Sequence, residues 1–216
     1  MALAEQLVIR QLGLQSYLPI WERMQAFTAE RTAETVDEIW QLEHEPVFTQ
    51  GHAGKAEHLI ATGDIPVVEV DRGGQVTYHG PGQSVVYLMI NIRRKKLGVK
   101  HVVAQMEQSV IALLNDYDIE AFARPDAPGV YVGNAKIASL GLRVRHGCSF
   151  HGLACNIDMD MAPFMRINPC GYAGMPMTQL AELVPGLDAA QAHRKLVMHL
   201  AEKLGYTQLS EYQTLD

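Results

Sequence analysis

The chain has 216 residues, of which 48% are hydrophobic and 19% are charged, and its formal net charge is -6. This size and balance are typical of one well-filled globular domain, so we expect a single domain spanning residues 1–216. A negative net charge argues against a nucleic-acid-binding protein, which normally presents a basic face. No basic leader opens the sequence and no apolar run could cross a bilayer, so we expect a cytoplasmic protein that does not bind membranes.

The first half of the chain is predicted to contain four strands and one helix. Alternating or continuous apolar residues predict strands, and apolar residues at helical spacing after Ser16 predict a helix that Ser16 caps. The predicted strands cover 7–12, 38–44, 65–70 and 84–92, and the helix covers 16–34. The strand at 84–92 is almost continuously apolar, which predicts burial on both faces. Residues 47–63 are polar and predict a connection without regular structure.

The second half alternates helices with short strands. A stripe of Val, Met and Leu from Val102 to Tyr117 predicts a core-facing helix, and Thr178 is predicted to cap a short helix over Leu180 and Leu183. The remaining elements are a strand at 119–123, two or three strands in 129–158 with turns at 132–135 and 146–147, an irregular segment at 163–176 and a helix at 188–204. Because strands and helices do not alternate as βαβ units, we expect a mixed α+β domain.

A Gly- and Pro-rich stretch at residues 70–83 is the first candidate for a functional site. Glycine lets a ligand approach the backbone closely, and a segment of this kind between strands can line a pocket. Arg72, Gln75, Thr77 and His79 place four polar side chains beside this backbone, which favours a site wall over a plain turn. The stretch lacks the spacing of a nucleotide-binding fingerprint.

Cysteine usage singles out one thiol. Three cysteines without an export signal indicate reduced thiols. Cys148 and Cys155 lie in strand-like sequence and are predicted to be small buried hydrophobes. Cys170 stands between Pro169 and Gly171 in an irregular segment, which suits a nucleophile that a substrate must reach. A free thiol has a pKa of about 8.5, so Cys170 needs a nearby cation to be largely thiolate at neutral pH.

Lys136 is the candidate for that cation. It is the only charged residue between Asp126 and Arg143, inside an apolar strand. One interpretation is an edge strand from which the amine reaches water. The other places the ammonium near the Cys170 sulfur, where it favours the thiolate and later takes a proton from an incoming amine. His79 and His151 remain alternatives, because Cys–His pairs are the more common arrangement.

Two other clusters of polar residues are candidates for sites. His146, Cys148, His151 and Cys155 lie within ten positions, but their spacing matches no standard zinc template, so no metal site is expected. The basic run from Arg93 to Lys96 is either a solvated loop or a surface that steers an acidic protein partner.

Four segments in chain order resemble the motifs of lipoyl(octanoyl) transferases, the octanoyltransferases of lipoate synthesis. They are RGGQVTYHGPGQ at 72–83, GNAKIAS at 133–139, HGLACNI at 151–157 and NPCG at 168–171. The combination runs over nearly the whole chain and is specific. The Gly-rich motif alone is shared, in looser form, with lipoate and biotin protein ligases.

The resemblance implies a biotin/lipoate protein ligase-like α+β fold, in which a mixed sheet packs with helices. It also implies transfer of an octanoyl group from octanoyl-acyl carrier protein to Cys170 as a thioester. From there the group passes to a lysine ε-amine on lipoyl domains of 2-oxoacid dehydrogenase complexes and on the glycine cleavage H protein. Cys170 matches the family nucleophile and Lys136 the lysine that partners it. No cofactor or nucleic acid is implied, and we expect a monomer.

The residues that match the acyl-binding segments of the family form three groups. The pocket is expected to be lined by Arg72, Gly73, Gly74, Gln75, Val76, Thr77, Tyr78, His79, Ser139, Leu140, Gly141, Gly152, Leu153 and Ala154. The small residues among them would leave room for an octanoyl chain.

Two other functions remain open on the sequence. The first is an ATP-dependent lipoate or biotin protein ligase, which would share the Gly-rich motif but has no need of Cys170. The second is a non-catalytic module that binds acyl carrier protein or lipoyl domains. Activity without ATP separates the transferase from the ligase, and a covalent product separates both enzymes from the binding module.

Overall fold

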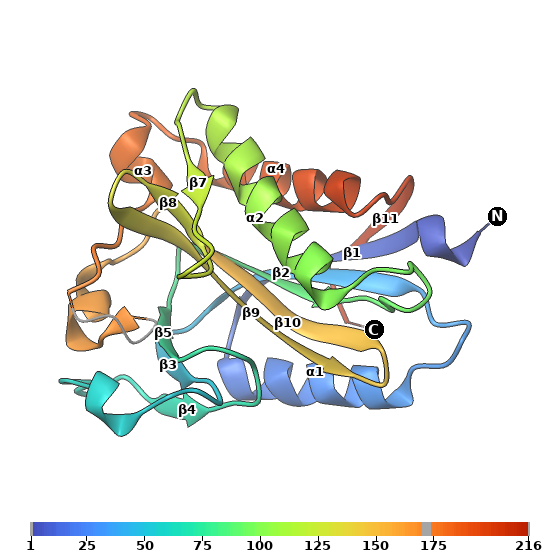
Figure 1. Cartoon of the computed structure of the whole chain (residues 1–216), viewed down its shortest axis with the longest axis horizontal. Coiled ribbons are helices and arrows are strands. Elements are labelled where there is room, and N and C mark those ends of the chain that lie inside the picture. Colours follow the sequence, from blue (N-terminus) through green and yellow to red (C-terminus); the bar gives the residue numbers. More distant parts are fainter. Residues whose placement is uncertain (1, 170–173, 216) are drawn as a thin grey trace.

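The computed structural model describes residues 2–169 and 174–215 (Figure 1). Its main feature is a large mixed sheet, eight-stranded in this described part of the chain. In spatial order the strands are β11 (Gln208–Tyr212), β1 (Gln6–Gln15), β2 (Asp37–His44), β6 (Gln83–Met89), β10 (Cys148–Asn156), β9 (Ala135–Arg145), β8 (Val130–Val132) and β7 (Phe122–Ala123). Strand β1 pairs in parallel with β2 and β11, and the other pairs are antiparallel.

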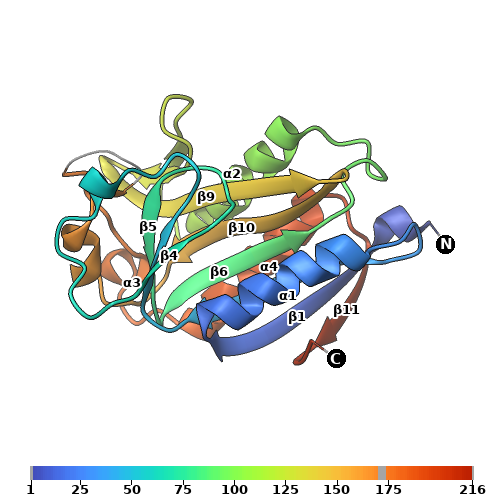
Figure 2. The same cartoon turned by 90° about the horizontal axis from the view of Figure 1, so that it is seen from below.

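Helices cover both faces of this sheet, as Figures 1 and 2 show. Helix α1 (Tyr17–Glu30) lies on one face, and α2 (Val99–Asn115) and α4 (Ala189–Lys203) lie together on the other. Two apolar clusters result, one around Met24 and Trp40 under α1, the other around Leu88, Val110 and Leu196 under α2 and α4. Strand β6 supplies side chains to both clusters, which confirms the strand predicted to be buried on both faces.

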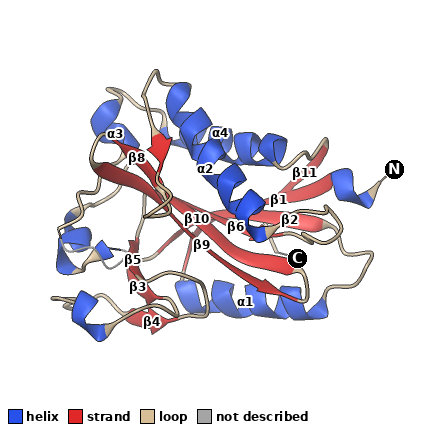
Figure 3. Cartoon of the chain, viewed as in Figure 1, coloured by secondary structure: helices blue, strands red, loops and turns tan. Residues whose placement is uncertain are grey.

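A small three-stranded sheet packs beside one end of the large sheet (Figure 3). It consists of β4 (Val67–Glu69), β3 (Val47–Gln50) and β5 (Val76–His79), with β3 in the middle. Strand β5 lies within the Gly-rich stretch at residues 70–83. The rest of that stretch forms the segments before and after this strand. The prediction that 47–63 has no regular structure was wrong, since β3 and the short helix η2 (Ala56–His58) fall within it.

Local contacts explain the other differences from the predicted elements. Helix α1 ends at Glu30 because Arg31 turns out of it to bond Asp37 and the carbonyl of Met89. The hydroxyl of Ser16 donates to Glu45 (2.6 Å) instead of capping α1. The remaining short helices are η1 (Leu3–Glu5), η3 (Ala162–Arg166) and α3 (Leu180–Leu183).

Helix α3 and the last strand also differ from expectation. Gln179 occupies the N-cap position of α3, while the Thr178 hydroxyl donates to Glu182 on the following turn (3.1 Å). Strand β11 was not predicted, because its mixed, largely exposed residues carry no clear alternation. No helix in the described residues combines the length and the apolar character needed to cross a membrane.

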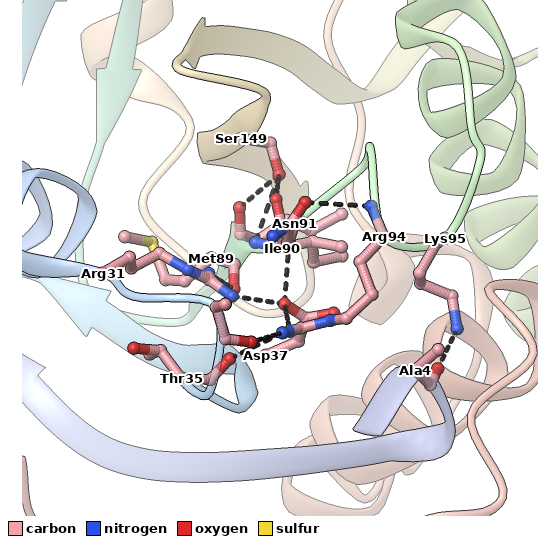
Figure 4. A network of polar contacts seen from close by, with 12 residues as sticks. Ala4, Arg31, Thr35, Asp37, Met89, Ile90, Asn91, Arg94, Lys95 and Ser149 are labelled. Atoms are coloured by element: carbon pink, nitrogen blue, oxygen red, sulfur yellow. Dashed lines mark hydrogen bonds and ion pairs between the residues drawn. The ribbon is translucent and has the colours of Figure 1, made fainter. Parts of the chain in front are cut away.

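A buried ionic network fixes one end of the large sheet (Figure 4). The carboxylate of Asp37 is fully buried and receives bonds from Arg31, from Arg94 (2.6 Å) and from the Asn91 N–H (2.7 Å). Lys95 donates to the carbonyl of Ala4 at 2.7 Å. The basic run at 93–96 is therefore not simply a solvated loop, because its two central side chains make internal bonds.

Replacing Asp37 with Asn is expected to lower the free energy of unfolding by about 3–5 kcal/mol, because it removes the buried carboxylate that pairs with two guanidinium groups. Urea denaturation of the variant and the parent measures the difference. Asp64→Asn is the matched control, since that carboxylate is 99% exposed and its loss should change little. Equal effects of the two substitutions would contradict a structural role for the network.

Candidate active site

A cavity of about 420 Å³ lies where the Gly-rich loop meets strands β9 and β10. Strand β8 pairs only with the first residues of β9, Ala135 to Ala138, so β9 continues beyond β8 from Ser139 onward. The N–H of Gly73 donates to the carbonyl of Leu142 at 3.2 Å and ties the Gly-rich loop to that stretch of β9. The cavity forms around this junction.

The structure brings most of the residues expected in an acyl pocket to this one cavity. Its wall includes Arg72, Gly73, Gly74, Gln75, Val76, Thr77, His79, Ser139, Leu140, Gly141, Gly152, Leu153 and Ala154. Tyr78 lies outside the wall: its ring packs against Phe48 and Phe164, each 5.5 Å away between ring centroids. Tyr78 belongs instead to the apolar cluster of the small sheet, together with Phe48 and Phe164.

The cavity also has lining residues that the sequence did not indicate. Tyr17 of α1, Tyr87 of β6, Val103 of α2 and Pro128 all contribute to the wall. Each comes from a segment that reads as ordinary core or loop. Only the three-dimensional packing brings them to the junction, so no local pattern could have found them.

Two glycines in the wall serve backbone packing. A Cβ on Gly152 would lie 2.0 Å from the carbonyl oxygen of Val86, and one on Gly141 would lie 3.0 Å from that of Gly73. Glycine is therefore needed at Gly152 for the approach of β6 and at Gly141 for the approach of the Gly-rich loop. At these two positions the missing side chain makes room for neighbouring backbone.

Lys136 lies at the start of β9, and its side chain is only 1% exposed. The interpretation that its amine reaches into water from an edge strand was therefore wrong. The backbone of Lys136 pairs with the segment after residue 174. Its backbone N–H donates to the carbonyl of Pro176 (2.8 Å), and its backbone carbonyl accepts from the N–H of Thr178 (3.0 Å). The ammonium nitrogen lies 5.5 Å from the centroid of the Tyr131 ring. An amine buried at the wall of a cavity can act on a ligand held there, which makes Lys136 a candidate catalytic group.

Cys170 falls outside the residues that the structure describes. The described chain reaches Pro169 on one side of it and resumes at Gly174 on the other. The N–H of Asn168 donates to the carbonyl of His58 at 2.9 Å, and the segment from Pro176 to Thr178 pairs with Lys136. The chain that follows the predicted nucleophile therefore runs beside the predicted basic partner. Contact between Cys170 and Lys136 stays a prediction.

His79 is buried in a chain of hydrogen bonds. Its Nδ1 lies 2.7 Å from Oε1 of Gln83 and its Nε2 lies 3.2 Å from the Thr49 hydroxyl. Burial lowers the pKa of His79 to about 3, so the ring is neutral at neutral pH. Gln83 then donates to Asn156 (3.0 Å), and Asn156 donates to the carbonyl of Thr178 (3.0 Å). This arrangement indicates a structural role for His79 in holding the segment beside Lys136.

His151 lies toward the other end of the cavity. It is opposite Leu142 in the β9–β10 ladder, six positions along β9 from Lys136, which corresponds to roughly 20 Å. Its Nε2 is 2.9 Å from Asp71. Burial raises the pKa of Asp71, but hydrogen bonds from His151 and Trp21 outweigh that effect and lower it to about 2. Burial lowers the pKa of His151. The strand register thus separates His151 from Lys136.

Cys148 and Cys155 are both buried in the sheet, as predicted. Burial raises the pKa of Cys155 to about 12, so its thiol stays protonated at neutral pH. Among the residues that the structure describes, no group of three or more His, Cys, Asp or Glu side chains gathers as a metal site would require.

Residues 16–201 match the family model described as "Lipoyl protein ligase A/B catalytic domain". The chain therefore contains a lipoyl protein ligase-type catalytic domain. A solved lipoate-protein ligase A bound with ATP aligns with a TM-score of 0.72 and 13% identity, over 98% of this chain and 89% of that one. A biotin protein ligase from Aquifex aeolicus in complex with biotin and ATP aligns with a TM-score of 0.58 and 14% identity, over 93% and 70%. The predicted biotin/lipoate protein ligase-like α+β fold is therefore confirmed.

Sequence identity then narrows the assignment. A curated octanoyltransferase from Azotobacter vinelandii is 63% identical over 201 residues, which cover 93% of this chain and 92% of that protein. The chain belongs to the octanoyltransferases of the lipoyl protein ligase A/B family and is an acyltransferase. The predicted resemblance is confirmed.

Proposed function

We propose that the enzyme takes octanoyl from octanoyl-acyl carrier protein onto Cys170 and passes it to a lysine ε-amine of a lipoyl domain. The acceptors are the lipoyl domains of 2-oxoacid dehydrogenase complexes and the glycine cleavage H protein. Residues 1–216 act as one catalytic domain, monomeric and in the cytoplasm. The burial of Lys136 at the cavity, with the chain downstream of Cys170 bonded to its backbone, supports this proposal most directly.

The proposed reaction has two acyl transfers. The Lys136 ammonium stabilises the Cys170 thiolate, which attacks the thioester carbonyl and expels the carrier as a thiolate. The departing thiolate takes the proton of the Lys136 ammonium, which leaves Lys136 as a neutral amine. The acceptor amine then attacks the new thioester, Lys136 takes a proton from it, and the Cys170 thiolate leaves. Exchange of one thioester for another is nearly balanced, so no ATP is needed. The amide product is more stable and draws the sequence forward.

The apolar part of the cavity suits the octanoyl chain. Val76, Val103, Leu140 and Leu153 line it, and its volume of about 420 Å³ falls within the usual range for small-molecule sites. Each CH₂ group that leaves water contributes about 0.8 kcal/mol, so a linear eight-carbon chain gains appreciable binding from this wall alone.

Intact-protein mass spectrometry tests the proposal directly. The protein is mixed with octanoyl-acyl carrier protein in the absence of ATP. We expect an added octanoyl mass that maps to Cys170 and is discharged by an apo lipoyl domain. No adduct, with ATP restoring modification of the lipoyl domain, would instead identify a ligase. No covalent product under either condition would identify a binding module.

Two long segments of the chain contain no acidic residues, and this supports an acidic partner for the surface that they form around Arg93 and Arg145. Residues 72–106 and 127–157 contain no Asp or Glu, although the whole chain carries 24 such residues against 18 Lys and Arg. The loop that begins at Ile92 is bonded to the β9–β10 turn through the carbonyl of Gly147 (3.0 Å). Arg93 and Arg145 are exposed on the two sides of this contact. An acidic carrier protein would be attracted to such a surface.

Reversing the charge of Arg93 and Arg145 to Glu together is expected to raise the KM for the carrier-bound donor on the order of tenfold at low salt. The difference should shrink as salt is added, since exposed charges are screened. Steady-state kinetics at two ionic strengths measures it. Arg194→Glu with Lys203→Glu, two exposed positions on α4, is the matched control. An unchanged KM, or an equal change in the control, would contradict this docking surface.

A further inference from the structure

Glu107 on helix α2 is connected to Lys136 through a single backbone group. Its Oε1 accepts the N–H of Gly129 at 3.2 Å. Gly129 adopts φ of +145°, and a Cβ there would lie 2.3 Å from Cε and 3.0 Å from Nζ of Lys136. The backbone of Gly129 therefore lies against the charged end of the lysine. A carboxylate on α2 holds that backbone in place.

The charges of Glu107 and Lys136 also interact. Burial raises the pKa of Glu107, while the Gly129 N–H and the charge of Lys136 act in the opposite direction. In the sequence, Glu107 is the one acidic residue between Asp71 and Asp116. Glu107 is thus an acidic residue in an otherwise basic part of the chain, and its carboxylate bonds the backbone beside the buried lysine.

The other charged and titratable groups on this side of Lys136 are engaged with one another. The hydroxyl of Tyr131 donates to the carbonyl of Ala127 at 2.8 Å. The guanidinium of Arg124 lies 5.2 Å from the centroid of the Tyr131 ring and pairs with Asp126 at 2.8 Å. Glu107 is a carboxylate whose charge interacts with that of Lys136, since Lys136 acts to lower the pKa of Glu107.

We propose that Glu107 is a positioning residue for Lys136: it holds the Gly129 backbone against the lysine and supplies a negative charge that stabilises the ammonium. This inference rests on the proposed function, in which Lys136 first stabilises a thiolate and then accepts a proton. A nearby anion favours the charged form of a lysine. Its removal should therefore make the amine lose its proton at a lower pH.

Three substitutions separate the two contributions of Glu107. Glu107→Gln keeps an oxygen that can accept the Gly129 N–H but removes the charge. Glu107→Ala removes both. Glu107→Asp restores the charge on a shorter side chain and serves as the conservative rescue. Glu202→Gln, an exposed carboxylate on α4, is the matched control. Thermal unfolding of each variant verifies that the fold is retained.

The first readout does not depend on activity. NMR of lysine labelled at its side chain follows the titration of Lys136, assigned by the loss of its signal in Lys136→Met. We expect Glu107→Gln to shift that titration to lower pH. Glu107→Asp should recover part of the shift, and the control should show none. A Lys136 titration in Glu107→Gln that matches the parent would overturn the inference.

The second readout is the pH dependence of acyl-enzyme formation in a single turnover. In Glu107→Gln the alkaline limb should move to lower pH together with the NMR titration, with the KM for the donor unchanged. Glu107→Ala should in addition lower the rate at every pH, because Gly129 is no longer held. The NMR titration of Lys136 could shift in Glu107→Gln while the pH dependence of acyl-enzyme formation stays unchanged. That result would support the interaction between Glu107 and Lys136 but refute the proposed catalytic role of Lys136.

Discussion

Replacing Cys170 with Ser is expected to abolish the octanoyl-enzyme adduct and to lower turnover by about a thousandfold or more, as for the loss of other covalent nucleophiles. A serine hydroxyl is far less acidic than a thiol, so one buried ammonium cannot convert it into an anion at neutral pH. Mass spectrometry of a single turnover detects the adduct, and the rate of lipoyl-domain modification reports turnover.

The other two cysteines provide the control for this experiment. Cys148→Ala removes a buried thiol that lies in β10, and burial excludes such a group from nucleophilic chemistry. It should leave the adduct intact, with at most a modest loss of stability from the smaller side chain. Undiminished turnover in Cys170→Ser would refute the covalent mechanism.

Replacing Lys136 with Met should produce the second large effect. Met fills a similar space without a charge, so the pKa of Cys170 is expected to rise toward the ordinary value of about 8.5. Both transfers should slow by roughly a hundredfold to ten thousandfold, the usual contribution of an acid–base group. The rate of thiol alkylation against pH measures the pKa. Cys155 contributes little background in the native protein, because its thiol is buried and has a pKa of about 12.

Lys136→Arg distinguishes the two tasks given to the lysine. Arginine retains the positive charge but does not release its proton in proteins. Formation of the acyl-enzyme should therefore survive better than transfer to the acceptor amine. An alkylation profile that is the same in the parent and in Lys136→Met would show that the lysine does not tune the thiol. His79 and His151 would then be tested next, although both rings are held by internal hydrogen bonds.

Long, strongly patterned segments made most of the fold predictable. Strand β6 and helix α2 have continuous or periodic apolar residues whose burial does not depend on a particular neighbour. Strands β3 and β11 were missed because they are short and depend on pairing with distant segments. Helix α1 ends at Glu30, earlier than the predicted end at residue 34, because the side chain of Arg31 turns out of the helix to bond Asp37.

The candidate site was predictable to the extent that its residues share a local motif. The Gly-rich loop and the β9–β10 segments each present several wall residues in one short stretch. The burial of Lys136 was not predictable, since it depends on how closely Gly129 can approach. The separation of His151 from Lys136 required the strand register. Cys170 lies outside the described residues, so its role remains a prediction.

The position of β1 between β2 and β11 affects the order of folding during synthesis. Gln6 pairs with Gln208, so one side of β1 waits for residues made about 200 positions later. At about 5–20 residues per second this delay lasts roughly 10–40 s. During that time β1 exposes unpaired N–H and C=O groups, which can recruit strands from other chains. The nascent protein should therefore be most prone to aggregation just before its last strand leaves the ribosome.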